Sequence, residues 1–487
     1  MEIEPNHPPE SAKTGWKTME PRNIWPLALN LISCFLFMMN SYIVEPSSAY
    51  YANALGSSDA LSGIMIGAAP WFAFFSAVGY SYWTNVSYKR PIIFAGVLMV
   101  VGNLLYANAY GYKSMELCLL GRSMTGLGAP RVINRRYVAD ATPFSLRTAT
   151  SAAFAMATAL GAALGPGMAI LLNLFEFEIM LPLFGKQIFN GMTGPGYFMA
   201  FSWFVYTVTI IFTFQEPNRS GLDELRAREA TGSRHDEEEK ALVSEIMDGE
   251  DISIDISSQR DESVSVVGPL LKPVSCLRRI TAATVICMVV IFLKRTALEA
   301  LVASTSVVTK NRYSWTIAHV GSLHLVNGFI VIPVSFLAGW LSQHYEDRYL
   351  ALWLITITVA GMAIMVDMTD VFAHSNDHYN QDNFLSVGPI RYVIGSLIAF
   401  SGIEACNPFV ASLMSKVVPS SLAAGTFNSG LLATLVGTSG RATGDLMITV
   451  MGLTSLRNLL NLLIVPGMLM MLFCGFLIRR NYNVLAV

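Results

Sequence analysis

Long apolar runs, separated by short polar connections, fill most of the 487-residue chain. A run of about 18 or more nearly uncharged residues is long enough to cross the hydrocarbon core of a bilayer as a helix. The pattern predicts twelve such helices, at residues 24–44, 61–83, 91–110, 117–138, 148–172, 196–214, 280–306, 316–342, 349–367, 389–413, 422–447 and 457–478. We therefore expect an all-α membrane protein with twelve transmembrane helices.

Two longer stretches interrupt this pattern. Residues 215–275 contain the acidic run "HDEEEKALVSEIMDGEDISIDISSQRDES" and bury too little apolar surface to fold alone. We interpret them as a solvated, disordered loop, with a phosphorylation or sorting segment as the alternative. Residues 173–195 are too broken by glycine, proline and charge to span, so we expect a loop on the lumenal or external surface.

The acidic loop divides the expected helices into six and six. The predicted organisation is an N-terminal tail at 1–22, a six-helix half at 23–214, the loop at 215–275, a second half at 276–480 and a tail at 481–487. Lys and Arg are more frequent in the short loops on the side of the two tails than in the opposite loops. By the positive-inside rule, both tails and the acidic loop lie in the cytosol.

Composition narrows the class of protein. Hydrophobic residues make up 53% of the chain and charged residues only 14%, with a mean hydropathy of +0.48, whereas soluble proteins carry about 25% charged residues. The net charge of −2 gives no reason to expect a nucleic-acid partner. The cysteines form no CxxC pair, the histidines lack metal-ligand spacing and there is no P-loop. We expect no metal, no cofactor, no enzyme and no ATP-driven pump.

Four arginines occur inside one expected helix. The stretch "GRSMTGLGAPRVINRRYVAD" (121–140) contains Arg122, Arg131, Arg135 and Arg136. A charged side chain at mid-bilayer costs roughly 2.5–3.5 kcal/mol on insertion scales, so such residues face a protein interior or a wet cavity. Arg131 and Arg135 are four apart and share a helix face. Arg136 is close to the cytosolic end, where an anchor is the simpler interpretation.

The second half supplies charges of both signs. In "FLKRTALEAL", Arg295 and Glu299 are spaced to form an ion pair across one helical turn, and Arg441 and Asp445 have the same spacing in the eleventh expected helix. For the latter pair, a structural or gating role and substrate binding remain open. Glu404 in "SGIEACNP" is another intramembrane acid with both interpretations open.

These residues together favour an anion site. Guanidinium groups match the several acceptors of a tetrahedral oxyanion with paired, charge-assisted hydrogen bonds. We expect Arg131 and Arg295, from opposite halves, to meet at a common cavity, as alternating access requires. Glu299 would neutralise Arg295 when the site is empty. Asn40 and Tyr42 in the first helix are candidate hydrogen-bonding partners of the substrate.

Several motifs resemble those of a known superfamily. "GRSMTGLG" (121–128) and "ALGAALGPG" (159–167) are similar to motifs in the fourth and fifth helices of the major facilitator superfamily (MFS). "GYSYWTNVSYKR" (79–90) and "GWLSQHYEDR" (339–348) occupy equivalent cytosolic turns after the second and eighth helices. The resemblance implies the MFS fold, with two related six-helix halves, and a structural or gating role for Arg122.

A narrower resemblance follows from motifs spread over nearly all helices. They are "FLFMMNSYIVEPS", "RVINRRYVAD", "STSVVT", "IPVSFLAGWLSQHYEDR" and "GTFNSGLLATLVGTSGRATGDLMIT". They are similar to the membrane part of plant-type SPX–MFS vacuolar phosphate transporters. This resemblance implies a secondary transporter of inorganic phosphate in a vacuolar or lysosomal membrane. Because about 22 residues precede the first helix, we expect the SPX domain to be absent here.

Two alternatives remain open. The chain also resembles, more loosely, lysosomal MFS proteins associated with neuronal ceroid lipofuscinosis, which would imply a carrier or channel for another anion such as chloride. A non-transporting membrane receptor or scaffold that signals through residues 215–275 is the alternative from a different class.

The orientation makes a testable prediction. Both glycosylation sequons, at Asn85 and Asn218, are on the expected cytosolic side. When the chain is expressed in a eukaryotic cell, neither asparagine should carry a glycan, because glycosylation occurs on the lumenal side. Digestion with a glycosidase should leave the gel mobility unchanged, and a mobility shift would reverse the topology.

Overall fold

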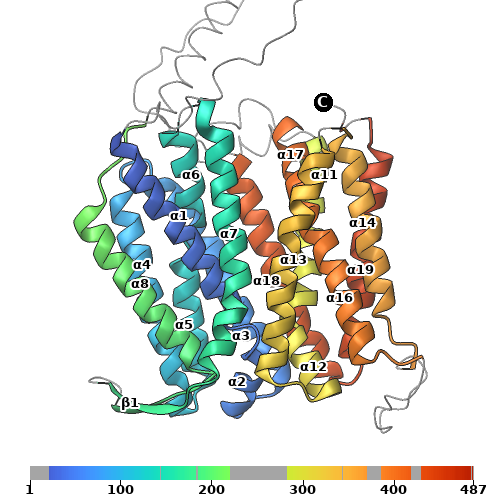
Figure 1. The fold of residues 1–487 in the computed structure, drawn as a ribbon, viewed down its shortest axis with the longest axis horizontal. Helices are drawn as coiled ribbons and strands as arrows, with labels where there is room; N and C mark the ends of the chain where they lie inside the picture. The colour runs from blue at the N-terminus through green and yellow to red at the C-terminus, as the bar shows by residue number, and fades with distance from the viewer. Residues whose placement is uncertain are drawn as a thin grey trace, which may run out of the picture.

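The computed structural model describes residues 21–142, 144–181, 185–219, 282–342, 344–369, 385–417, 429–483 and 485. Most of these residues are helical, and the long helices run side by side in one bundle (Figure 1). Most of the acidic loop at 215–275 and most of the N-terminal tail lie outside the described residues, so the structure does not bear on those expectations.

The N-terminal part of the bundle contains most of the shorter elements. Its elements are α1 (Pro21–Tyr42), α2 (Ser48–Ala54), the 3-10 turn η3 (Asp59–Leu61), α3 (Ser62–Trp83), α4 (Lys89–Tyr112), α5 (Met115–Leu127), α6 (Arg131–Ala141), α7 (Phe144–Leu172), β1 (Phe177–Leu181), β2 (Gly185–Phe189) and α8 (Gly194–Thr213).

The C-terminal part is entirely helical where the structure describes it. Its elements are α11 (Ala282–Ala303), α12 (Thr305–Tyr313), α13 (Ile317–Leu341), α14 (Asp347–Ile364), α16 (Pro389–Ala405), α17 (Asn407–Val417), α18 (Ser429–Thr454) and α19 (Leu459–Arg480). In Figure 1, α1 begins and the chain ends at the same end of the bundle, here called the terminal end. The opposite end, with β1, α2 and α12, is called the hairpin end.

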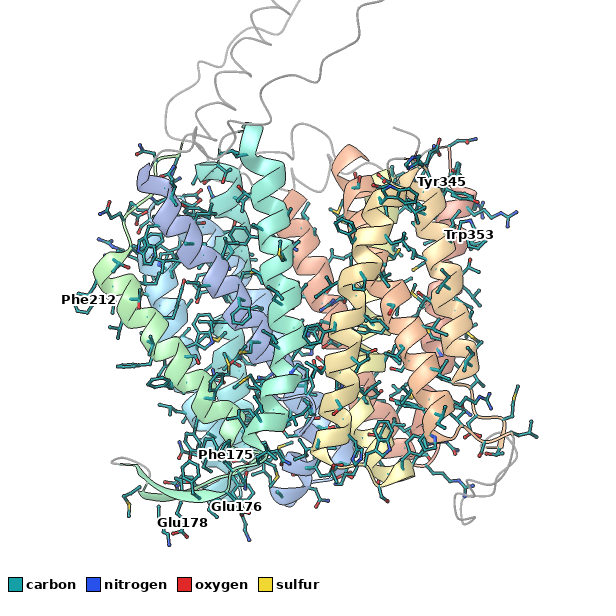
Figure 2. The ribbon with its side chains drawn as sticks, in the orientation of Figure 1. Phe175, Glu176, Glu178, Phe212, Tyr345 and Trp353 are labelled. Atoms are coloured by element: carbon teal, nitrogen blue, oxygen red, sulfur yellow. The ribbon has the colours of Figure 1, made fainter. Side chains whose placement is uncertain are left out.

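The outer faces of the bundle are apolar. Large side chains such as Phe212, Phe336 and Trp353 are more than half exposed, and Figure 2 shows Phe212 and Trp353 pointing away from the bundle. A helix satisfies its own backbone hydrogen bonds, so helices with apolar outer faces are suited to a lipid environment. The exposed apolar residues therefore belong against lipid.

Nine helices in the described part of the chain are long and apolar enough to cross a membrane, against the twelve predicted. The three predicted spans that fall short are 117–138, 280–306 and 422–447. Within them, 280–306 carries Lys294, Arg295 and Glu299, and the other two also carry charged residues. The shortfall therefore falls on the segments that hold most of the candidate site residues.

The span predicted at 117–138 is two helices rather than one. The helix α5 ends at Leu127 and α6 begins at Arg131, with Gly128, Ala129 and Pro130 between them. Proline has no N–H to donate to the carbonyl four residues earlier, so an uninterrupted helix loses a hydrogen bond there. The break places Arg131 at the first position of α6.

The segment 173–195 does not span, as expected, but it is not an irregular loop. The strands β1 and β2 form an antiparallel hairpin in which Phe177 pairs with Phe189. Gly185, with φ of +68°, begins the second strand in a conformation that favours glycine. The hairpin lies across the end of the bundle (Figure 1). The sequence pattern did not predict these strands, because charged residues and glycine interrupt the alternation of apolar and polar positions.

The helix α18 packs against both α3 and α11 and so joins the two parts of the bundle. Close approach depends on glycine. A Cβ atom added to Gly440 or Gly444 would come within 2.7 Å of a carbonyl oxygen of α11, and one added to Gly67 would come within 2.8 Å of the Cβ atom of Asp445. Small residues spaced four apart allow such contacts between membrane helices.

Replacing Gly444 by alanine should therefore destabilise the protein. The added methyl group overlaps the Thr296 carbonyl, and overpacking of this kind costs about 1–3 kcal/mol. A lower melting temperature of the detergent-solubilised protein would show it. The control is Gly79→Ala in α3, where no atom lies within 4 Å, and this change should leave the melting temperature unchanged or raise it slightly. Equal melting temperatures for the two variants would contradict the packing argument.

Candidate functional site

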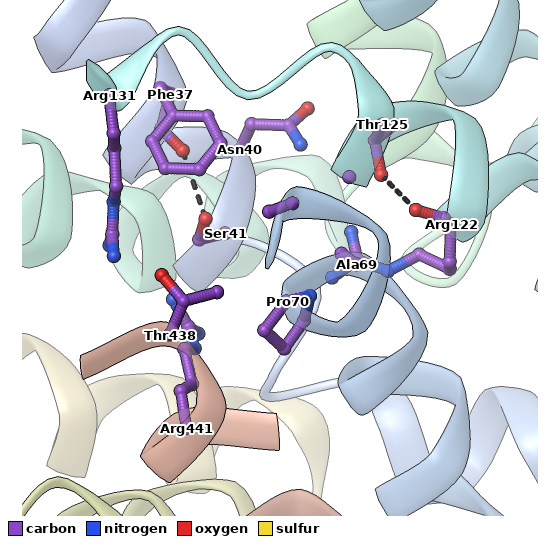
Figure 3. A pocket seen from close by; sticks show the side chains of 12 residues that line it. Phe37, Asn40, Ser41, Ala69, Pro70, Arg122, Thr125, Arg131, Thr438 and Arg441 are labelled. Carbon is purple, nitrogen blue, oxygen red and sulfur yellow. Dashed lines mark hydrogen bonds between the residues drawn. The ribbon is translucent and has the colours of Figure 1, made fainter. Parts of the chain in front are cut away.

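A small cavity lies between the N-terminal helices and α18. Its lining residues come from five helices and are Phe37, Asn40, Ser41, Ala69, Pro70, Ala73, Arg122, Thr125, Gly126, Arg131, Thr438 and Arg441 (Figure 3). About 20 Å³ is open to the centre of a water molecule, which is room for one or two waters or an ion of similar size. Three of the lining side chains are arginines.

Among the described residues, Arg131 contacts a sulfur atom and an aromatic ring. Its Nη2 is 3.3 Å from the Met38 sulfur, and its guanidinium lies 5.1 Å from the centre of the Phe37 ring. Among the described residues it has no carboxylate within ion-pair distance. In Figure 3 its side chain extends from the start of α6 beside Phe37. Arg131 thus presents positive charge to the cavity with no opposite charge bound to it.

Arg122 is in a similar state, and it is more deeply buried. It is 2% exposed, its Nε donates to the Met65 carbonyl at 3.4 Å, and its Nη1 has no hydrogen-bond partner among the residues that the structure describes. The side-chain oxygen of Asn40, which is 3% exposed, also lacks a partner. Buried polar groups are normally hydrogen-bonded. Unpaired groups at the wall of one cavity are consistent with a site that is completed by a bound ligand.

Arg441 is held by two carboxylates. Its Nε is 2.7 Å from Glu299 Oε1, and its Nη2 is 3.3 Å from Glu45 Oε1. The ring of Tyr42 lies 5.4 Å from its guanidinium carbon. Arg441 therefore belongs both to the wall of the cavity and to a buried ion-pair network.

This network continues away from the cavity. Glu299 Oε2 is 3.7 Å from Arg295 Nη2, so the i, i+4 pair expected from the sequence is present. Arg295 Nη1 is in turn 3.4 Å from Glu404 Oε1. Asn407 donates to Glu404 Oε2 at 2.6 Å and accepts a hydrogen bond from Lys294. Charges of opposite sign thus alternate through α16, α11 and α18.

Two sequence-based expectations about these residues are wrong. Arg441 and Asp445 form no ion pair among the described contacts, because Arg441 turns to Glu299 on the neighbouring helix. Arg295 does not line the cavity with Arg131. Glu299 and Glu404 hold it, and Arg441 is the guanidinium that α18 brings to the cavity. The i, i+4 rule considers a helix alone and cannot identify a closer partner across an interface.

The remaining candidates have separate positions. Tyr42 packs on Arg441 and does not line the cavity. Arg135 is exposed and donates from Nη1 to Thr434 on α18 at 2.6 Å. Arg136 pairs with Asp140 at 3.3 Å, and its side chain is only 10% exposed.

Glu45 is the functional candidate that sequence reasoning missed. It lies in the turn after α1, is 1% exposed and contacts Arg441. A signal was available, because an acid flanked by "SYIV" and "PSSAY" is unusual at the end of an apolar run.

At the hairpin end, polar contacts join the N-terminal and C-terminal parts. Lys310 donates to Asp59 at 2.7 Å, and the hydroxyls of Ser48 and Ser306 are 2.7 Å apart. The hydroxyl of Tyr50 donates to the carbonyl of Trp315. These contacts close one end of the bundle below the cavity.

The long apolar helices and the lipid-facing outer surface define a multi-pass integral membrane protein, and comparison with known proteins identifies the family. The family described as Major Facilitator Superfamily matches residues 31–445, so this chain belongs to the Major Facilitator Superfamily.

Relatives of this chain share one name. The chain is 34% identical over 451 residues to an SPX domain-containing membrane protein of Arabidopsis thaliana and 32% identical over 451 residues to one of Oryza sativa subsp. indica. Both matches cover 91% of this chain and 62% of the relative. The chain thus spans less than two thirds of the length of these relatives.

Solved structures with a similar fold include transporters. One is a mutant of the peptide transporter POT in complex with sulfate, with a TM-score of 0.59, 15% identity and coverage of 98% of this chain and 99% of that chain. Another is a bacterial homologue of the human lysosomal transporter Spinster, inward-facing and unoccupied, with a TM-score of 0.58, 11% identity and coverage of 94% and 95%. At these identities the likeness concerns the fold.

Replacing Arg441 by methionine should destabilise the protein strongly. The change leaves Glu299 and Glu45 buried without their partner, and breaking a buried pair in this way costs about 3–5 kcal/mol. Adding Glu299→Gln to this variant should recover part of the loss, because it removes one of the orphaned charges. Melting temperatures of the two single variants and the double variant in detergent measure this coupling, and strictly additive losses would exclude it.

Proposed function

We propose that this protein is a secondary transporter that moves inorganic phosphate across a vacuolar-type membrane by alternating access. The observation that carries the proposal is the state of Arg122 and Arg131. Both line one small cavity, and neither has a carboxylate partner among the described residues. Withdrawing a cation from water costs several kcal/mol, and a bound anion offsets that cost.

The arrangement of donors supports an oxyanion as the substrate. Arginines from α5, α6 and α18 reach the cavity from different directions, and Thr438 adds a hydroxyl group. The hydroxyls of Ser41 and Thr125 also line the cavity, but they donate to backbone carbonyls of their own helices. A tetrahedral oxyanion offers several acceptors to such a set, whereas a halide is a single centre. The small volume supports an inorganic ion over a sugar or a peptide unless the cavity widens.

Phosphate and the vacuolar membrane are supported by resemblance. The motifs quoted above are similar to those of SPX–MFS vacuolar phosphate transporters, and the relatives at 32–34% identity are named SPX domain-containing membrane proteins. A lysosomal membrane and another anion, such as chloride or sulfate, form the competing version of the same mechanism.

We also propose the full membrane topology. Counting α5 with α6 and α16 with α17 as single broken spans, α1 to α8 contribute six crossings through α1, α3, α4, α5/α6, α7 and α8. The C-terminal part contributes six more through α11, α13, α14, α16/α17, α18 and α19. The terminal end, with both tails and residues 215–275, then faces the cytosol, and the hairpin end faces the lumen.

Alternating access requires contacts at the two ends of the bundle to form and break in turn. The contacts at the hairpin end, including Lys310–Asp59, must break when the lumenal side opens. At the terminal end, the contact between Arg135 and Thr434 joins α6 to α18. We assign Arg135 to closing the cytosolic side, where an arriving anion can compete with Thr434 for its guanidinium.

The ion-pair network connects substrate to this movement. An anion in the cavity competes with Glu299 for Arg441, and Arg295 remains available to Glu299 on its other oxygen. Exchange of partners by Arg441 alters the contact between α18 and α11. In this scheme Arg131, Arg122, Arg441 and Asn40 bind the anion, while Arg295, Glu299, Glu404 and Tyr42 hold Arg441 and its partners in position.

Replacing Arg131 by alanine should abolish or greatly reduce phosphate transport. A hydrogen bond to a charged group contributes about 1.5–3 kcal/mol, or roughly 10- to 150-fold in affinity. Uptake of radiolabelled phosphate by proteoliposomes measures this effect, and the melting temperature checks folding. Arg131→Lys should retain part of the activity, because the charge remains and the paired geometry is lost.

The matched control is Arg480→Ala, at the exposed end of α19, which should transport phosphate normally. Excess unlabelled sulfate or chloride, added with the radiolabelled phosphate, tests whether another anion is the main substrate. Phosphate should compete best with the label, and stronger competition by chloride would reject phosphate as the main substrate. Normal uptake by Arg131→Ala would reject the assigned site.

A further inference from the structure

Three carboxyl groups surround Arg441 in the buried centre of the protein. Glu299 and Glu45 form ion pairs with it, and Asp445 lies one helical turn further along α18. Glu45 and Glu299 are 1% exposed and Asp445 is fully buried. The ion pairs account for Glu299 and for one oxygen of Glu45, but not for Asp445.

Within the described part of the chain, Asp445 has no hydrogen-bond partner on either carboxyl oxygen. Its Cβ atom packs against Gly67 of α3, where a side chain on the glycine would approach to 2.8 Å. A buried carboxylate without a hydrogen-bond donor is costly in its ionised form, so such a group takes up a proton instead. The second oxygen of Glu45 is unpaired as well.

The charges that face Asp445 come from several elements. On its own helix there is Arg441, from α11 there is Glu299, from the turn after α1 there is Glu45, and from α5 there is Arg122. The helix α3 contains no Asp, Glu, Lys, Arg or His. The turn η3, which also packs on α18, carries Asp59, and that carboxylate is paired with Lys310.

Arg441 lies between the cavity and Asp445. Arg441 lines the cavity on one side and lies within electrostatic reach of Asp445 on the other. When Asp445 is protonated, the cavity is bordered by arginines whose charge is only partly balanced by Glu299 and Glu45. When Asp445 loses its proton, a further negative charge competes for Arg441 and makes the cavity less attractive to an anion.

We propose that Asp445 is the proton-binding site of the transporter and that its proton and the anion in the cavity bind cooperatively. Such coupling is reciprocal, so the anion favours protonation of Asp445 as much as the proton favours the anion. The two ions therefore move in the same direction through one alternating-access cycle. This inference rests on the proposed function, since it requires an anion at the cavity, but it assigns the coupling ion and its site independently.

The test uses the full chain in proteoliposomes, with the membrane potential clamped. With both sides of the membrane acidic enough for H2PO4⁻ to dominate, the ionisation of phosphate itself does not trap label. Wild-type protein should then accumulate radiolabelled phosphate when the proton gradient points inward, up to about tenfold per pH unit for one proton per anion. A protonophore should abolish this accumulation. Asp445→Asn keeps the shape of the protonated side chain, so it should still exchange phosphate at equal pH while losing accumulation driven by the gradient.

The control is Glu178→Gln on the exposed hairpin, where the carboxylate pairs only with Lys186, and this variant should behave like the wild type. The inference is overturned if Asp445→Asn accumulates phosphate as well as the wild type, or if the wild type exchanges phosphate but ignores the gradient. In both cases phosphate transport itself stands. If the wild type moves sulfate or chloride and not phosphate, the substrate assignment fails and the same gradient assay with that anion decides on Asp445. Absence of flux for every anion would overturn both proposals.

Discussion

The buried contact between Arg441 and Glu299 is the interaction on which the site depends. It joins α18 to α11 at 2.7 Å, and Arg441 also contacts Glu45 in the turn after α1. Glycines at 440 and 444 allow the two helices to approach closely enough for this contact. A membrane helix that carries a charge needs such a partner, because lipid offers none. The contact with Glu299 requires α18 and α11 to pack closely, and this packing places Arg441 at the wall of the cavity.

The sequence predicted the class of fold and most of the helices, because runs of apolar residues have a direct relation to bilayer thickness. It also predicted that charges inside expected spans mark the interior, and Arg122, Arg131 and Arg441 do line one cavity. It did not predict which charges pair. Spacing along a helix identified Arg295 with Glu299 but assigned Asp445 to Arg441, whereas the partner of Arg441 comes from another helix. Contacts between helices depend on their packing, which no local pattern specifies.

Because a local pattern does not specify contacts between segments, the sequence also failed to predict the position of Glu45 and the β1–β2 hairpin. Glu45 lies beyond the last residue of α1, where a reading by periodicity stops, yet the turn brings it back to the centre of the bundle. The strands β1 and β2 are short and interrupted by charge, and they are stabilised by each other and by stacking of Phe177 on Phe189. Both features depend on contacts between segments that are separated by a reversal of the chain.

The helices that are least suited to lipid carry the arginines of the site and of its ion-pair network. The broken pair α5 and α6 and the helices α11 and α18 fall outside the nine that qualify as spans by length and composition. Each is shielded by more apolar neighbours, such as α3, α4 and α19. Because an unpaired charge is tolerated only where protein or water replaces lipid, weak hydropathy in an otherwise apolar chain indicates a position at the centre. The interrupted and charged segments of this sequence are therefore its most informative ones, since they mark the helices whose charges are enclosed by the rest of the bundle.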